Sequence, residues 1–107
     1  MKKQFEVSCF GTTYSVVIVK REYPGGNLAL QVLNWDDEFQ DYEPFGVLTV
    51  NIPGQPLLPG FAFLKNYSEN AEWAEALAKA IGGRPTGKSV RTGFVTVPLW
   101  DFRKINI

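Results

Sequence analysis

Hydrophobic and polar residues alternate along the first half of the chain, a pattern that predicts β-strands. Residues 4–10 place their apolar side chains on one side, the period of two expected of a half-buried strand. Residues 13–22 are rich in β-branched and aromatic side chains and predict a second strand, paired with the first in an antiparallel hairpin. Residues 28–35 follow a Pro-Gly-Gly-Asn turn signal and predict a third strand, and residues 45–52 predict a fourth. The expected arrangement is a four-stranded meander in which each strand lies next to its neighbour in sequence.

The most apolar continuous stretch of the chain, residues 45–64, begins with this fourth strand. Residues 53–60 contain three prolines, which fix the backbone and cannot donate to a sheet ladder. They predict a stiff, irregular crossing that leads to a short strand at 61–64. Leu57 and Leu58 must then be covered by another element or be exposed to a partner, and we expect them to be covered by the helix described next.

The hydrophobic period then changes to that of an amphipathic helix over residues 68–81. Its apolar stripe comprises Trp73, Ala74, Leu77, Ala78 and Ile81. Ser68 or Asn70 is expected to cap its start, and the Gly-Gly pair that follows is expected to end it.

The rest of the chain predicts a loop at 84–87, closing strands at 88–92 and 94–99, and a mixed tail at 100–107 that is free to fray. The predicted fold class is α+β, a single domain over residues 1–107. It consists of a twisted antiparallel sheet of five to seven short strands, with one amphipathic helix packed on one face.

Composition narrows the range of functions. The 107 residues carry 11 basic and 11 acidic side chains, and this balance argues against a globally basic nucleic-acid binder and against a heavily acidic DNA mimic. A single cysteine and no signal-peptide or membrane-spanning pattern predict a soluble, cytoplasmic protein with no membrane association. Without histidine, the commonest general base and most zinc sites are lacking, so we expect neither an enzyme nor a metal or other cofactor.

One motif matches a nucleotide-binding pattern by its letters alone. Residues 82–89 read GGRPTGKS, which fits the P-loop pattern G-x-x-x-x-G-K-[ST]. A P-loop lies between a strand and a helix, whereas here a helix is predicted before the motif and a strand after it. We therefore interpret the segment as a helix end and a turn.

Acidic and aromatic residues are interleaved in one segment, and they are the candidate protein-binding residues: Trp35, Asp36, Asp37, Glu38, Phe39, Asp41, Tyr42 and Glu43. No glycine lies between Trp35 and Pro44, which argues against a calcium loop. The segment is interpreted as a loop over residues 36–44, either merely solvated or protein-binding, because aromatic anchors with charged neighbours are typical of binding hot spots. Mimicry of a phosphate backbone by its carboxylates is a weaker alternative.

Basic residues gather in the last quarter of the chain, and they are the nucleic-acid candidates: Arg84, Lys88, Arg91, Arg103 and Lys104. Three aromatic residues, Phe94, Trp100 and Phe102, lie nearby in sequence. Such a surface could bind single-stranded nucleic acid, although aromatic residues in this setting are more often part of the core.

An ordered series of short motifs extends through the second half of the chain: LTVNIP at 48–53, LLP at 57–59, NYSEN at 66–70, TG at 86–87, and GF with VPL between 93 and 99. This series resembles a small bacterial family of unknown function that is common on phages, plasmids and integrative elements, and the resemblance spans roughly residues 34–102. It implies a short accessory protein that binds a host or element protein, for example as an anti-CRISPR or anti-restriction inhibitor.

Two other interpretations remain open from the sequence. One is a nucleic-acid-binding module that uses the basic C-terminal half, and the other is a structural domain with no separable activity. Pairing of two copies into a homodimer through exposed strand edges is also left open.

Overall fold

The computed structural model describes residues 3–107 and contains eight strands in two antiparallel sheets with one short helix. The first sheet has the order β1 (Phe5–Cys9), β2 (Thr12–Glu22), β3 (Leu28–Asp36) and β4 (Asp41–Val47). The second has the order β5 (Thr49–Val50), β6 (Phe61–Leu64), β8 (Val95–Asp101) and β7 (Arg84–Thr92). The α+β class is correct in its broad form, but the single sheet of five to seven strands is wrong.

The expected meander is present in the first sheet, but its fourth strand is not the uninterrupted 45–52 run. The chain changes sheets at Leu48, which donates its backbone N–H to Leu30 O (2.9 Å) and accepts one from Lys65 N (2.9 Å). Residues before Leu48 pair with β3, and residues after it pair with β6. Leu48 is completely buried, so the apolar run that predicted one strand connects two sheets through the core.

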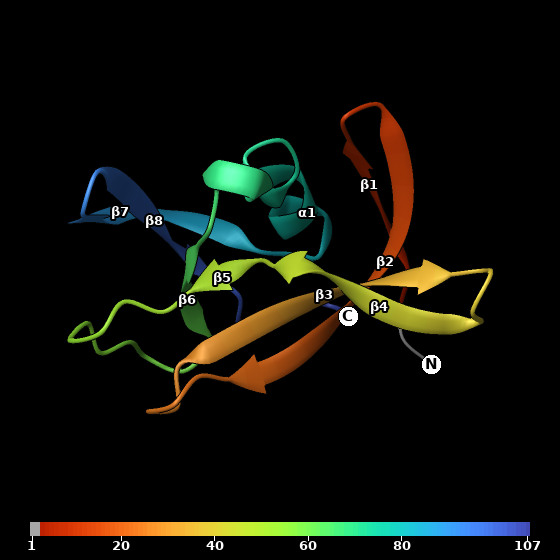
Figure 1. Cartoon of the computed structure of the whole chain (residues 1–107). Coiled ribbons are helices and arrows are strands. Elements are labelled where there is room, and N and C mark those ends of the chain that lie inside the picture. Colours follow the sequence, from red (N-terminus) through yellow and green to blue (C-terminus); the bar gives the residue numbers. More distant parts are fainter. Residues whose placement is uncertain (1–2) are drawn as a thin grey trace.

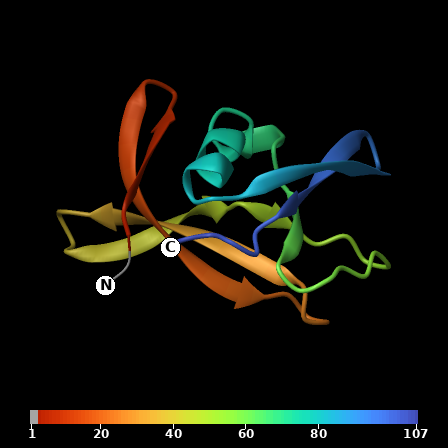
Figure 2. The same cartoon turned by 180° about the vertical axis from the view of Figure 1, so that it is seen from behind.

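Helix α1 (Ala74–Ala80) is shorter than the expected 68–81 helix and is preceded by a 3₁₀ turn, η1 (Ser68–Asn70). Every residue of the predicted apolar stripe is buried. The helix lies between the β1–β2 hairpin and the second sheet, as both views show (Figures 1 and 2). Its entry packs on the first sheet, where the rings of Trp73 and Phe45 lie 5.1 Å apart.

Neither predicted cap forms. No side chain caps η1 or α1, and Asn70 is instead buried and donates from Nδ2 to Val47 O (2.7 Å). Its amide therefore ties the helix entry to the end of β4.

The C-terminal segment is ordered, so the expectation of a fraying tail is wrong. Trp100 lies within β8, and Phe102 is 1% exposed with its backbone N–H donating to Gly60 O (2.8 Å). Asn106 N donates to Ile81 O (2.9 Å), which holds the tail against the end of α1. The expected loop at 84–87 is also wrong, because β7 begins at Arg84 and contains a bulge between Pro85 and Ser89.

The proline crossing does not cover the helix stripe. Leu58 is 72% exposed and Leu57 is partly buried, and both line a depression with Phe61 and Leu99 of the second sheet. Figure 1 shows the crossing at the end of the molecule away from the β3–β4 turn. The expectation that α1 would cover these leucines is therefore wrong.

The β1–β2 turn holds a phenylalanine in an unfavourable backbone conformation. Phe10 and Gly11 have φ values of 51° and 79°, as a two-residue type I′ turn requires. We expect Phe10→Asn to raise the free energy of unfolding by up to about 1 kcal/mol, because asparagine tolerates left-handed φ better. Chemical denaturation measures the change, with Phe94→Asn at another exposed turn as the control. A loss of stability in Phe10→Asn alone would contradict this interpretation.

Candidate protein-binding ribbon

The acidic–aromatic segment is not a loop but the end of a β-hairpin, which we call the ribbon (residues 33–44 of β3 and β4). Trp35 pairs with Tyr42 and Asp36 pairs with Asp41, so only residues 37–40 form the turn. Cross-strand partners share a face, and successive residues alternate between faces. The aromatic residues that alternate with acids in the sequence are therefore separated from Asp36, Asp41 and Glu43 in space.

The turn is fixed by hydrogen bonds from its own side chains. Asp36 Oδ1 accepts the backbone N–H groups of Glu38 (2.9 Å) and Phe39 (3.3 Å), which is an Asx-type turn. Asp37 Oδ1 accepts a hydrogen bond from Trp35 Nε1 (2.8 Å), and Gln40 adopts a positive φ of 53°. These contacts hold Phe39 at the tip, where it is 75% exposed.

One face of the ribbon continues into an apolar surface on the outer side of the first sheet. Val17, Val19, Leu33 and Tyr42 line a shallow depression of about 370 Å³ there. The rings of Trp35 and Tyr42 meet edge to face with centroids 5.0 Å apart, which extends the apolar surface toward the tip. We call these five residues the aromatic face. Val17 is buried at its base (2% exposed), and none of the five belongs to the main core cluster.

The opposite face of the ribbon is acidic. Asp36 and Asp41 lie directly opposite each other, and Glu43 accepts a hydrogen bond from Asn34 Nδ2 (3.2 Å). Like charges in directly opposed positions destabilise a hairpin. Neither of the two ion pairs found among residues 3–107 involves a ribbon carboxylate, so the negative charge of the ribbon is uncompensated.

The basic candidates do not form one surface. Arg84 and Lys88 lie on the face of the second sheet that carries Leu99, whereas the register places Arg91 on the opposite face. Arg103 is engaged with Asp101 through two bonds, from Nη2 (2.8 Å) and Nε (3.0 Å), and lies 4.8 Å from the centre of the Phe61 ring. Lys104 is exposed in the C-terminal segment beyond β8.

The Arg103 guanidinium gives a testable pH effect. Its hydrogen bonds lower the pKa of Asp101 to about 2. A depressed carboxyl pKa adds stability above the pKa of the unfolded state, and that stability is lost as pH falls from about 4 to 2. We expect Arg103→Gln to return the Asp101 pKa toward 3.8, measured by NMR titration of the carboxyl carbon. Glu69, whose pKa is lowered to about 2 by Lys65, is the internal control and should not move.

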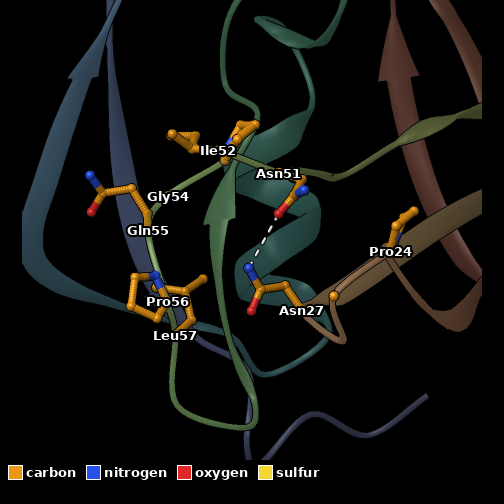
Figure 3. Close-up of a pocket in the computed structure, with 10 residues that line it drawn as sticks. Pro24, Asn27, Asn51, Ile52, Gly54, Gln55, Pro56 and Leu57 are labelled. Carbon is orange, nitrogen blue, oxygen red and sulfur yellow. Dashed lines mark hydrogen bonds between the residues drawn. The ribbon is translucent and has the colours of Figure 1, made fainter.

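A separate, wider depression lies between the β2–β3 turn and the proline crossing. Its volume is about 580 Å³, and Asn27 Nδ2 donates to Asn51 Oδ1 (3.2 Å) to join its two walls (Figure 3). Gln55 adds a third amide, and the rest of the lining consists of proline, glycine and aliphatic residues. No titratable side chain lines this depression, so it supplies no group for acid–base chemistry.

The GGRPTGKS segment does not form a phosphate-binding loop. Arg84 to Ser89 lie within β7, and Thr86 Oγ1 donates to Leu99 O (2.8 Å) and accepts from Lys88 N (3.1 Å) to close the bulge. The segment therefore follows a helix and belongs to a strand, the reverse of the order that a P-loop needs.

Three further observations concern metal binding, the single cysteine and membrane-spanning helices. Over residues 3–107, no group of three or more His, Cys, Asp or Glu side chains is placed to hold a metal ion. Burial raises the pKa of the Cys9 thiol, which disfavours its reactive thiolate form. In the same range, no helix has the length and apolar character needed to cross a membrane.

The sequence interpretation did not identify the residues of the first sheet that contribute to the aromatic face. The sequence predicts strands that contain Val17, Val19 and Leu33, and the unbroken apolar run at 16–19 indicates a strand with both faces apolar. The separation of aromatic and acidic residues was also missed, because it depends on recognising that residues 41–44 are a strand.

The motif series that suggested a family resemblance has structural roles in the fold. Leu48 joins the sheets, Thr49 lies at a buried polar contact, and Asn70 ties η1 to β4. A family model described as a domain of unknown function (DUF4313) matches residues 19–106, most of the chain. No curated protein and no solved structure matches. The expectation of a family of unknown function is thus confirmed, and the chain belongs to the DUF4313 family.

Proposed function

We propose that this protein is a non-enzymatic protein-binding factor that contacts its partner through the aromatic face. The observation that supports this most directly is the apolar depression formed by Val17, Val19, Leu33 and Tyr42 on the solvent side of a sheet. Apolar surface that is left outside the core and rimmed by polar residues is typical of interaction sites. Tyr42 is 41% exposed and packed against Trp35, so a partner would meet a ring that is already positioned.

The charge of the ribbon indicates the chemistry of that partner. Residues 31–47 contain five carboxylates and no basic residue. A partner that places an apolar side chain in the depression and basic residues around it would complement both the aromatic face and the acidic face of the ribbon. The clustering of like charges, which costs stability, is the kind of local conflict expected where function outweighs stability.

The biological setting follows from the resemblance described above. We propose an accessory protein of a bacterial mobile element that acts in the cytoplasm, with inhibition of a host defence protein as the specific role. A small, rigid, acidic ribbon could block a protein whose functional surface is basic, because opposite charges favour their association.

The function can be tested by affinity capture from bacterial lysate with quantitative mass spectrometry. We expect at least one protein to be enriched by the wild type and to be captured at least about tenfold less by Tyr42→Ser, as for a hot-spot aromatic residue. Tyr67→Ser is the matched control, because Tyr67 is the N-cap residue of η1 and is not part of the ribbon, and it should capture as the wild type does. If no captured protein depends on Tyr42, the proposal is wrong.

Nucleic-acid binding is the second candidate, and one observation favours it. Phe94 is fully exposed at the β7–β8 turn, near Arg91, as in a base-stacking platform. Binding of single-stranded oligonucleotides that falls steeply with salt and is lost in Phe94→Ala would support this alternative. A flat binding curve would reject it.

A further inference from the structure

We infer that the protein self-associates head to tail, with Phe39 of one copy inserted in an apolar slot at the opposite end of the next copy. The slot is lined by Pro56, Leu57, Leu58, Phe61, Thr86, Lys88 and Leu99. This inference concerns a different surface from the aromatic face and does not depend on the proposed function.

The slot has the size and character of a site for one apolar side chain. Its volume of about 260 Å³ is below the usual range for drug-sized ligands, which begins at about 300 Å³. Its lining is mainly aliphatic and aromatic, and Leu58 on its wall is 72% exposed. The bulge in β7, closed by Thr86, shapes one wall, and the proline crossing forms the other. A large exposed leucine beside an apolar slot is surface that a second side chain would cover.

The rim of the slot is basic. Lys88 lines the slot directly and belongs to neither ion pair among residues 3–107. Arg84 lies on the same face of the second sheet, opposite Asp101 in the register. Arg103 stacks on Phe61, one of the lining residues, although its charge is balanced by Asp101. An occupant that carries carboxylates next to an apolar group would therefore be favoured.

The ribbon tip of the same protein has these properties. Phe39 is 75% exposed, and Asp37, Glu38 and Asp41 are its neighbours in sequence. The Asx-type turn holds the tip in a defined shape, so little conformational entropy would be lost when it docks. The tip thus presents an apolar side chain among carboxylates, and the slot presents an apolar cavity beside the Lys88 ammonium group, which belongs to neither ion pair among residues 3–107.

The two surfaces cannot meet within one molecule. The ribbon tip and the proline crossing lie at opposite ends of the structure, whose longest dimension is 42 Å (Figure 1). The contact is therefore heterologous, joining different surfaces of two copies, and such contacts build open chains unless the rotation between copies closes a ring.

Sedimentation velocity at increasing protein concentration tests the inference. For the wild type we expect a weight-average mass that rises above the 12.0 kDa monomer and falls again at high salt. Phe39→Ser and Leu58→Ser should each weaken association at least about tenfold. Phe94→Ser is the matched control, because it removes a phenylalanine that is even more exposed from another turn and should associate as the wild type does.

A mixture of the two variants gives the sharper result. Leu58→Ser retains the intact tip and Phe39→Ser retains the intact slot, so the equimolar mixture should form a 1:1 dimer that grows no further. A wild type that stays monomeric at all concentrations would overturn the inference. So would association that neither variant weakens, or two monomeric variants that do not combine on mixing. Tyr42 takes no part in this contact. The sedimentation result therefore decides the self-association, and the capture experiment separately decides the proposed function.

Discussion

Replacing Phe102 by alanine is expected to lower the free energy of unfolding by about 3–5 kcal/mol, the range found for large aromatic residues removed from a core. The ring is 1% exposed and stacks with Trp100 at a centroid distance of 6.2 Å. It also lies so close to Gly83 that a β-carbon there would come within 2.7 Å of it. Because the chain after α1 closes over the ring, the cavity left by alanine has little scope to collapse.

Urea denaturation monitored by tryptophan fluorescence measures this change. Phe94→Ala removes the same side chain from a fully exposed position and should change stability by less than about 0.5 kcal/mol. A small effect for Phe102→Ala would mean that the C-terminal segment does not complete the core.

The second large effect is expected at Thr49, which is 2% exposed. Its hydroxyl oxygen accepts the backbone N–H of Leu30 (3.1 Å) and lies 3.0 Å from the Tyr23 hydroxyl. Thr49→Val keeps the shape of the side chain but leaves a buried N–H without its acceptor, so we expect a loss of about 1–3 kcal/mol in the free energy of unfolding.

Thr49→Ser is the control for this prediction, because it retains the hydroxyl and loses only one methyl group. Thermal and urea denaturation of the pair separate the two contributions. If valine proves as stable as threonine, or serine proves much worse than valine, then packing rather than the hydrogen bond accounts for the role of Thr49.

The elements that the sequence predicted well are those whose pattern is local. The β1–β2 hairpin follows from the alternation at residues 4–10 and from the β-branched and aromatic residues at 13–22. The buried stripe of α1 follows from a spacing of four residues. The proline crossing was also predicted as an irregular segment, because proline restricts the backbone wherever it occurs.

The change of sheet at Leu48 could not be read from the sequence. A strand that stays in one sheet and a segment that passes through the core into a second sheet have the same apolar composition. What separates them is the partner on each side, here Leu30 in one sheet and Lys65 beside β6 in the other. The exposure of Leu58 was missed for a similar reason. The residues of the proline crossing do not indicate whether it packs against α1 or against the second sheet.

The ribbon was mistaken for a loop because acidic residues have low strand propensity and Pro44 disfavours a strand interior. Both are tolerated here since β4 is an edge strand and Asp36 organises the turn. The acidic and aromatic candidates therefore lie together in the ribbon, but the sequence did not show that they fall on two faces. The basic candidates do not share one surface, because Arg91 faces away from Lys88 and Arg103 is bound to Asp101.

Site-specific photo-crosslinking can show whether the aromatic face contacts a protein partner. A benzophenone side chain placed at position 42 and activated in cells should crosslink to the protein whose capture depends on Tyr42. The same group at position 67 should give no such product. Crosslinking from position 67 that equals crosslinking from position 42, or no product from position 42 at all, would contradict the proposed contact.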